Sequence, residues 1–385
     1  MRKQKIAVIF GTRPDTIKLA PIILQLRRER RFFHVVTIAT AQHRQMLDQV
    51  LDVFRIRPDH DLNVMRPNQT LAEITKNTIG ALDHLLARIK PGMVLVQGDT
   101  TTTFVGSLAA FYRRIPVGHV EAGLRTHDKS NPYPEEINRR LTSSIADLHF
   151  APTDTARKAL LRENIRKDDI FVTGNSVIDA LKIAVRKQYT FSVPELNAVV
   201  ARRRKIVLIT MHRRENWGPP MESSARAIRR IAEKYPEIDI VFPVHLNPVV
   251  REVVFRVLSG LTNVSLIHPL DYLDFVNMIA RSYLIITDSG GVQEEAPSLG
   301  KPVLVLRDVT ERPEAVEYGT VRLVGLREER IVSAARKLLD DRRAYDAMAS
   351  ATNPYGDGLA ARRTVRIIKH YFGYSRTLPK EFVPR

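Results

Sequence analysis

Two acidic residues lie directly after two consecutive apolar runs. Asp99 follows the run MVLVQG (93–98), and Glu121 follows IPVGHV (115–120). If both runs are strands of one parallel sheet, the helix-length segment between them is the crossover. Both carboxylates then lie at the carboxyl edge of the sheet, where open α/β sheets bind ligands. A third acidic pair, Glu135 and Glu136, follows in the Pro-bounded loop NPYPEE, and clustered carboxylates of this kind favour proton-transfer chemistry.

Phosphate-binding patterns follow other expected strands. In TDSGGVQEE (287–295), the backbone N–H groups of Ser289, Gly290 and Gly291 can face a phosphate at a helix start. Glu295 either satisfies the helix dipole or binds ribose hydroxyls. In GTRPDTIKLAP (11–21), Arg13 and Lys18 lie near a helix start, as an anion site or as ordinary surface bases.

Two histidines and an arginine complete the set of candidates. His212 in MHRREN and His245 in PVHLNP each end an expected strand, where an imidazole can reach a ligand or serve the structure alone. Arg312, in a loop after another strand, suits phosphate geometry. The sequence has no metal-ligand signature, no G-x-G-x-x-G fingerprint and no P-loop, so we expect neither a metal nor a dinucleotide cofactor.

Apolar, β-branched runs alternate with helical segments along the whole chain, which predicts βαβ units and parallel sheets. We therefore expect an α/β fold with two doubly wound, Rossmann-like domains and a ligand cleft between them. The expected strands are Ile6–Phe10, His34–Thr40, Met93–Val96, Pro116–Val120, Leu148–Ala151, Ile170–Thr173, Ile206–Thr210, Ile238–Val244, Val264–Ile267, Leu284–Thr287, Pro302–Leu306 and Val321–Val324.

Composition narrows the class of protein. The chain has 385 residues, 44% apolar and 26% charged, as in soluble globular proteins. It has no apolar run near the roughly 20 residues of a membrane span and no signal-peptide pattern, so we expect a cytoplasmic protein without membrane contact. The absence of cysteine excludes disulfides and thiolate chemistry. The net charge of +18 fits nucleic acid or small anions, and because the basic runs match no nucleic-acid motif, we favour a nucleotide diphosphate.

Taken together and in order, ten segments resemble the non-hydrolysing bacterial UDP-N-acetylglucosamine 2-epimerases. The segments are GTRPDTIKLAP, TAQHRQMLDQVL, QGDTTTT, GHVEAGLRT, PYPEEINR, HRREN, PVHLNP, TDSGGVQEEAPSLGKPVLVLRD, TERPEAVEYGT and NPYGDG, which together span 11–358. The resemblance implies the GT-B fold and a homodimer. The strand runs on each side of a weak boundary near Gly174 predict a first domain over 1–173 and a second over 174–358. The resemblance implies that a C-terminal helix within 359–385 completes the first domain and that the second domain binds UDP.

The resemblance further implies reversible C2 epimerisation of UDP-N-acetylglucosamine to UDP-N-acetylmannosamine. UDP is eliminated to leave a 2-acetamidoglucal and then adds back, without a cofactor, and the product supplies cell-surface polysaccharides. Carried over by position, the catalytic residues are Asp99, Glu121, Glu135 and His212. The substrate contacts are Arg13, Lys18, Phe275, Ser289, Gly290, Gly291, Glu295 and Arg312. A possible allosteric site for a second substrate molecule comprises Gln42, His43 and Gln45.

The chain departs from the family pattern at three places. Asp15-Thr16 replaces a common Glu-Ala pair, Asn131 replaces a Ser, and Asn68 replaces an Arg expected in regulated members. The last departure argues against allosteric activation more than against catalysis. Two alternatives stay open: a hydrolysing 2-epimerase that releases N-acetylmannosamine and UDP, and a GT-B glycosyltransferase with a separate acceptor.

Overall fold

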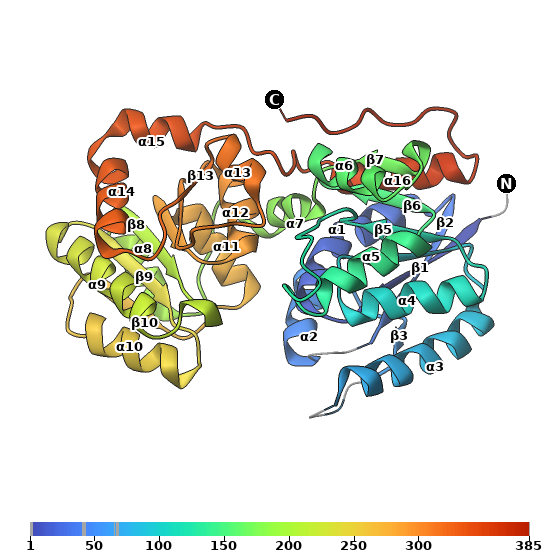
Figure 1. Ribbon diagram of the computed structural model, residues 1–385, viewed down its shortest axis with the longest axis horizontal. Coiled ribbons are helices and arrows are strands. Elements are labelled where there is room, and N and C mark those ends of the chain that lie inside the picture. The colour runs from blue at the N-terminus through green and yellow to red at the C-terminus, as the bar shows by residue number, and fades with distance from the viewer. Residues whose placement is uncertain (1–2, 41–43, 65, 67–68, 385) are drawn as a thin grey trace. The chain divides into compact units, whose positions relative to one another are not determined.

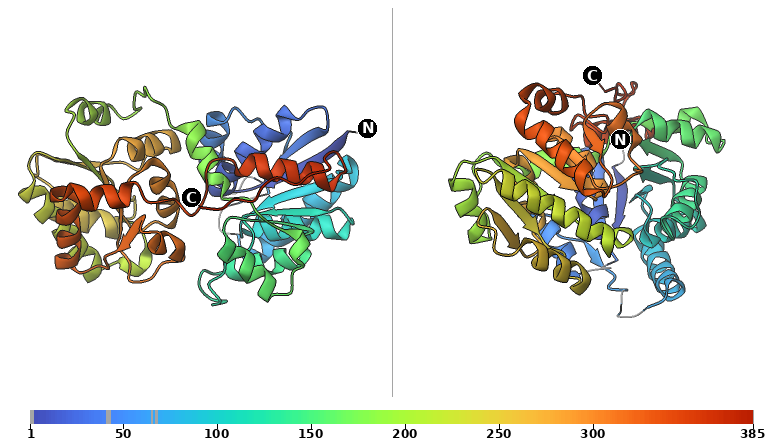
Figure 2. Two further views of the ribbon diagram at one scale, coloured as in Figure 1. Left: turned by 90° about the horizontal axis from the view of Figure 1, so that it is seen from above. Right: turned by 60° about the vertical axis from the view of Figure 1, so that its left-hand side comes forward.

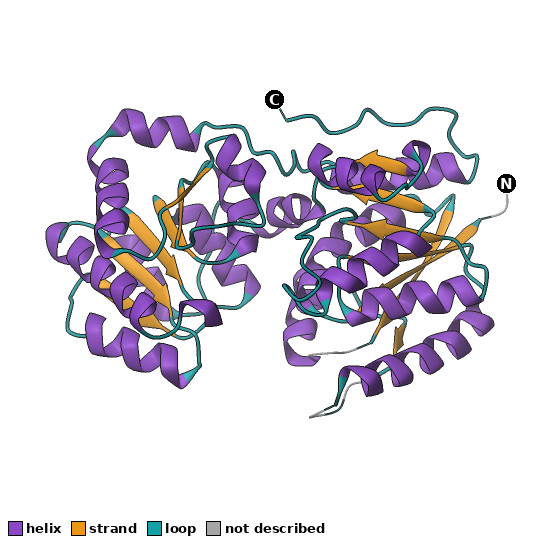
Figure 3. Cartoon of the chain, in the orientation of Figure 1, coloured by secondary structure: helices purple, strands orange, loops and turns teal. Residues whose placement is uncertain are grey.

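The computed structural model describes residues 3–40, 44–64, 66 and 69–384, without the side chains of 44–46 (Figure 1). The chain divides into two compact units. The first unit comprises Met1–Lys182 and Tyr355–Val383, and the second comprises Ile183–Pro354 and Pro384–Arg385. Each unit consists of a parallel sheet with helices around it (Figure 3).

The first unit contains a seven-stranded sheet in the order β3-β2-β1-β4-β5-β6-β7. Every neighbouring pair is parallel. The order reverses between β1 and β4, which is the kind of switch point where α/β sheets bind ligands. The strands are β1 (Gln4–Phe10), β2 (Phe33–Ala39), β3 (His60–Asp61), β4 (Met93–Gln97), β5 (Val117–Val120), β6 (Leu148–Ala151) and β7 (Ile170–Val172).

Threonine caps set the starts of four helices of the first unit. The Thr12 side chain accepts from Asp15 N at α1, and Thr70 does the same from Glu73 N at α3, each within a capping box. Single Thr caps begin α4 and α6. The helices are α1 (Arg13–Arg28), α2 (Arg44–Val53), α3 (Leu71–Ile89), α4 (Thr101–Tyr112), α5 (Glu135–Ile145), α6 (Asp154–Arg162), α7 (Ser176–Ala184) and α16 (Ala360–Tyr371).

The second unit repeats the same winding with a six-stranded parallel sheet in the order β10-β9-β8-β11-β12-β13. Here the switch point lies between β8 and β11. The strands are β8 (Ile206–Thr210), β9 (Asp239–Pro243), β10 (Val264–Ile267), β11 (Leu284–Thr287), β12 (Val303–Val305) and β13 (Val321–Leu323). The helices are α8 (Pro194–Ala201), α9 (Pro219–Lys234), α10 (Pro248–Leu258), α11 (Tyr272–Arg281), α12 (Gly290–Glu295), α13 (Pro313–Glu317), α14 (Glu328–Asp340) and α15 (Arg342–Ala349).

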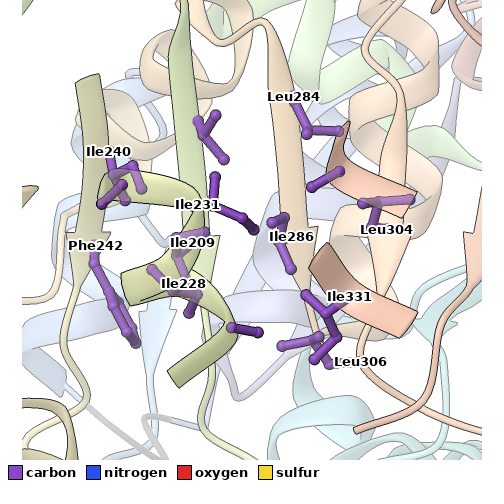
Figure 4. Packing of buried hydrophobic residues seen from close by; sticks show 14 of the residues in the cluster. Ile209, Ile228, Ile231, Ile240, Phe242, Leu284, Ile286, Leu304, Leu306 and Ile331 are labelled. Carbon is purple, nitrogen blue, oxygen red and sulfur yellow. The ribbon is translucent and has the colours of Figure 1, made fainter. Parts of the chain in front are cut away.

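The core of the second unit lies between its strands and the helices α9 and α14 (Figure 4). Ile209 and Ile286 from neighbouring strands pack with Ile228 of α9 and Ile331 of α14, and all four are buried. Full burial of one such side chain contributes roughly 1.5–3 kcal/mol. The packing therefore fixes the strands β8 and β11, whose carboxyl ends carry candidate site residues.

The last helix of the chain belongs to the first unit, where α16 packs against α1 (Figure 2). The carboxylate of Asp179 in α7 accepts hydrogen bonds from Ala360 N (3.1 Å) and Ala361 N (2.9 Å) at the start of α16. Burial raises the pKa of Asp179 to about 6. A side chain of one helix thus satisfies free N–H groups of another, which ties the end of the chain to the first unit. Among the described residues, no helix combines the length and apolarity of a membrane span.

Candidate active site

Glu121 lies at the carboxyl end of β5 with its carboxylate held by three side chains. Lys18 Nζ is 2.6 Å from Oε1 and 2.7 Å from Oε2, Asn175 Nδ2 is 2.8 Å from Oε1, and Gln97 Nε2 also donates to Oε2. The backbone of Glu121 has φ 61°, in the left-handed region that side-chain-bearing residues rarely adopt. Such conformations concentrate at functional sites, because the surrounding structure must stabilise them.

The structure gives Lys18 a partner that the sequence did not predict. The sequence places Lys18 at an anion site near the start of α1, whereas its ammonium group pairs with the carboxylate of Glu121. Lys18, predicted to contact the substrate, and Glu121, predicted to be catalytic, therefore form one ion pair. Arg13, the other predicted base of this segment, is exposed at the first position of α1.

Asp99 follows β4, the sheet neighbour of β5, and forms an ion pair with Arg139 of α5. Its backbone oxygen accepts from Asn138 Nδ2 at 3.0 Å. The buried Asp15 lies within electrostatic reach: burial, with a smaller contribution from the charge of Asp99, raises the pKa of Asp15 to about 6, against hydrogen bonds from Thr12 and Gly11. Two carboxyl groups near the switch point of this sheet therefore interact.

The two adjacent carboxylates at the start of α5 have different surroundings. Glu136 is fully buried and accepts from Thr126 N (3.0 Å), Thr126 Oγ1 (3.1 Å), His127 N (3.3 Å) and Arg139 Nη1 (3.3 Å). Glu135 is half-buried, and within the described part of the chain its carboxylate has no hydrogen bond or ion pair. Glu136 therefore anchors the preceding loop, while Glu135 is available to a ligand.

In the second unit, His212 follows β8 and pairs with Asp288, which follows the neighbouring strand β11. His212 Nδ1 lies 2.9 Å from Asp288 Oδ1, and Asp288 Oδ2 accepts from His212 N (2.9 Å) and Arg213 N (3.0 Å). Although burial opposes it, hydrogen bonding to His212 and Arg213 lowers the pKa of the Asp288 carboxyl. The His212 ring is stacked 6.4 Å from that of His245, the other strand-end histidine.

Ser289, Gly290 and Gly291 begin α12 directly after Asp288, as the sequence predicts. Three arginines surround the carboxylate of Glu311 close by. Arg213 Nη1 lies 3.5 Å and Arg307 Nη2 3.2 Å from Glu311 Oε1, and Arg312 Nη1 lies 3.8 Å from Oε2. A Cβ on Gly290 would lie 3.6 Å from Glu311 Oε2, so the arginines border the start of α12.

The other predicted contacts of the second unit flank this segment. Arg312 also pairs with the buried Glu294 of α12. Glu295 is buried in the same helix, and its charge contributes, after burial, to raising the pKa of Tyr272. Phe275 is half-buried in α11.

Some predicted residues cannot be placed. The allosteric candidates Gln42 and His43, and the departure at Asn68, lie outside the described residues. Gln45 lies in α2, but its side chain is not described. Within the described ranges, no three His, Asp or Glu side chains are grouped as metal ligands would be.

Sequence reasoning missed the residues that hold the catalytic candidates in place. These are Gln97, Asn175, Arg139 and Asp288, which contact Glu121, Asp99 and His212. Two of them carried a usable signal, since Gln97 and Asp288 directly end or follow strands at a ligand-binding edge. Arg139 lies in the motif PYPEEINR, although no role was assigned to it, whereas Asn175 carried no signal because it reaches the site from a distant segment.

Known proteins match this chain along its length. The sequence model of a family described as UDP-N-acetylglucosamine 2-epimerase matches residues 25–369. A UDP-N-acetylglucosamine 2-epimerase of Bacillus subtilis is 56% identical over 382 residues, 99% of each chain. One of Escherichia coli K12 is 53% identical over 373 residues, 95% of this chain and 98% of the relative.

Solved structures agree with these sequences. A putative UDP-N-acetylglucosamine 2-epimerase from Listeria monocytogenes has a TM-score of 0.94 at 48% identity, with 99% of this chain and 100% of that chain covered. A UDP-GlcNAc 2-epimerase from Neisseria meningitidis, solved with UDP-GlcNAc bound, has a TM-score of 0.84 at 48% identity, with 95% and 100% covered. The fold is thus the GT-B type of these epimerases.

Proposed function

The chain belongs to the UDP-N-acetylglucosamine 2-epimerase family, and we propose that it interconverts UDP-N-acetylglucosamine and UDP-N-acetylmannosamine without net hydrolysis. The observation that carries this proposal is the position of Asp99 and Glu121. They follow the neighbouring strands β4 and β5 at one edge of the first sheet, so two acid/base groups leave the same edge. Inversion at one carbon needs two such groups, because a proton leaves one face and arrives at the other.

The chemistry proceeds by elimination, since the C2 proton of this sugar is not adjacent to a carbonyl and direct abstraction is unfavourable. The C1–O bond to UDP breaks with its electron pair going to the diphosphate, and C2 loses its proton to a base. The products are UDP and a 2-acetamidoglucal. UDP then adds back to C1 while an acid delivers a proton to the opposite face of C2. No hydride carrier is required, and we propose that the enzyme works without a cofactor.

We assign the diphosphate to the second unit. The pairing of His212 Nδ1 with Asp288 leaves Nε2 for a phosphate oxygen, as in other carboxylate–histidine pairs. The side chain of His212 is 44% exposed, so a ligand can reach it. Arg312 and the backbone N–H groups of Ser289–Gly291 supply further donors to the charge that develops on the leaving group.

We assign the proton transfers to the first unit. Glu121 is fixed by three donors, and Asp99 by Arg139, so both are oriented before substrate binds. Glu135, half-buried and unpaired within the described residues, is proposed to stabilise positive charge on the ring or to relay a proton. General acid–base catalysis of this kind contributes about 10²- to 10⁴-fold, so leaving-group stabilisation must supply much of the remaining acceleration.

Incubation with UDP-N-acetylglucosamine in D₂O, followed by ¹H and ³¹P NMR, tests the proposal. We expect deuterium at C2 in both UDP-sugars and a constant total of UDP-sugar. Stoichiometric release of UDP and free N-acetylmannosamine would instead identify a hydrolysing enzyme. Transfer of the sugar to an added acceptor, without C2 exchange, would identify a glycosyltransferase.

Membership of the family also supports a proposal for the location, the oligomeric state and the role of the enzyme. We propose that the enzyme acts in the cytoplasm as a homodimer and supplies activated N-acetylmannosamine for cell-surface polysaccharides. UDP-sugars are its only proposed ligands, and we assign it no role with nucleic acids or membranes. Size-exclusion chromatography with light scattering tests the dimer directly.

A further inference from the structure

The segment Tyr355–Gly358, where the chain returns to the first unit, has no part in the chemistry described above. It lies within the sequence motif NPYGDG (353–358). We refer to Tyr355–Gly358 as the return segment. It packs against Gly174 and Asn175, the two residues of the loop between β7 and α7 that precede Ser176. Asn175 is also the side chain that donates to the carboxylate of Glu121.

The return segment and this loop touch backbone to backbone. Asn175 N donates to Tyr355 O at 2.6 Å. A Cβ on Gly356 would lie 3.3 Å from Asn175 O, and a Cβ on Gly174 would lie 3.4 Å from Gly356 Cα. A methyl group at Gly356 would therefore crowd the backbone of Asn175 by a few tenths of an ångström, and Gly174, with φ 81°, adopts a conformation that other residues rarely take.

Ion pairs and hydrogen bonds fix the return segment on the first unit. Arg363 of α16 forms two hydrogen bonds with the Asp357 carboxylate, at 2.8 and 2.6 Å, and also donates to Thr173 O at 3.1 Å. Lys182 Nζ donates to Asp357 O at 2.5 Å. Tyr355 itself is buried. The segment therefore has a set position relative to Asn175.

The amide of Asn175 has one orientation. Its Oδ1 accepts from Val177 N at 3.1 Å, which assigns the other amide atom, Nδ2, as the donor to Glu121 Oε1. Asn175 is buried, so its amide group is shielded from solvent. A displacement of the Asn175 backbone would consequently move the donor that orients the carboxylate.

We propose that Asn175 is a positioning residue for Glu121, and that the return segment sets the position of Asn175. The inference rests on the proposed function, in which Glu121 handles the C2 proton. Effective proton transfer depends on the placement of the reacting groups within fractions of an ångström. The return segment thereby influences the carboxylate of Glu121, which lies more than two hundred positions earlier in the sequence.

The first test is substitution of Asn175 in the full-length protein. Asn175→Ala removes the donor, and Asn175→Asp replaces it with an acceptor while keeping the shape and the bond to Val177 N. We expect kcat for epimerisation to fall about 10- to 100-fold in each variant, as for loss of a hydrogen bond to a charged group. KM and the Kd for UDP should stay within about twofold, since UDP is assigned to the second unit.

The second test perturbs the return segment without touching the site. Gly356→Ala places a methyl group 3.3 Å from Asn175 O and should lower kcat several-fold with KM unchanged. Gly80→Ala is the matched control, because a Cβ there meets nothing within 4 Å. Asn164→Asp is the control for added charge, since Asn164 is exposed and Asp tolerates its φ of 63°.

The outcomes separate the inference from the function on which it rests. A wild type that shows no C2 exchange in D₂O overturns the proposed function, and the inference with it. A wild type that epimerises while Asn175→Asp and Asn175→Ala retain full kcat overturns the inference alone. A Gly356→Ala variant that is less thermally stable but keeps the wild-type kcat per folded molecule also overturns it, because that result would show a structural role only.

Discussion

His212 Nδ1 lies 2.9 Å from the carboxylate oxygen Oδ1 of Asp288 across the switch point of the second sheet. They follow β8 and β11, which are neighbours in the sheet although they lie far apart in the sequence, and Thr210 pairs with Thr287 in the parallel register.

 The parallel register of β8 and β11 therefore places an imidazole and a buried carboxylate side by side. The carboxylate fixes the ring so that Nε2 is left for a ligand.

Substitution of Asp288 tests this arrangement. Asp288→Asn keeps the shape but offers one acceptor oxygen in place of two, so we expect the orientation of His212 to be lost and kcat to fall about 10- to 100-fold, as for loss of a hydrogen bond to a charged group. The pKa of Asp288 is lowered in the folded state, so its stabilising contribution is present above the unfolded pKa and is lost as the pH falls through the folded value. Steady-state kinetics with urea unfolding measures both effects. Asp168→Asn, at an exposed site, is the control, and full activity of Asp288→Asn would contradict the assignment.

The carboxylates of the first sheet are tested by removal of their charge. Asp99→Asn and Glu121→Gln should each lower kcat by about 10²- to 10⁴-fold, the range of general acid–base catalysis, while UDP still binds. The measurement is C2 deuterium exchange together with calorimetric titration of UDP. Full epimerase activity in either variant would remove that residue from the mechanism.

Glu135 and Glu136 offer a test with two adjacent residues. Glu136→Gln replaces a buried carboxylate that accepts from Thr126, His127 and Arg139, so we expect a loss of about 1–3 kcal/mol in the free energy of unfolding. Glu135→Gln should leave the free energy of unfolding unchanged and lower kcat. Chemical denaturation and kinetics on both variants distinguish the two roles, and a reversed pattern would exchange the assignments.

Asp15 predicts a pH dependence of stability. Its pKa is about 6 in the folded state against 3.8 as the reference value, so the folded state retains a proton that the unfolded state releases. Stability from this group is therefore present at low pH and is lost as the pH rises from about 4 to about 6, on the order of 3 kcal/mol. Asp15→Asn should lack that dependence. Parallel stability curves for the two proteins between pH 4 and pH 7 would contradict the prediction.

Much of the fold could be predicted from the pattern of apolar runs. All twelve expected strands are present in the structure, with bounds that differ by at most one residue at most ends. The additional strand β3 (His60–Asp61) was missed because its two polar residues form no apolar run. β3 forms because it pairs with β2 in the folded sheet, and the periodicity of apolar residues along the sequence carries no information about such pairing.

The candidate site was predictable only in part. Residues at strand ends, such as Asp99, Glu121 and His212, could be found because a parallel sheet gathers its carboxyl ends at one edge. Their partners could not be found in the same way. Arg139 reaches Asp99 from the middle of α5, and Asn175 reaches Glu121 from a loop after β7. Such contacts follow from packing between distant segments, which sequence spacing does not encode.

The discontinuity of the first unit has a consequence for how the protein is made. Its strands and most of its helices are synthesised first, but Tyr355–Val383, which completes it, is synthesised only after Ile183–Pro354 of the second unit. Until then the face of α1 that receives α16 is uncovered, and the carboxylate of Asp179 lacks the N–H groups that it caps. The second unit, whose chain is almost continuous, can fold during this wait. The first unit therefore cannot complete its fold until Ile183–Pro354 of the second unit has been translated.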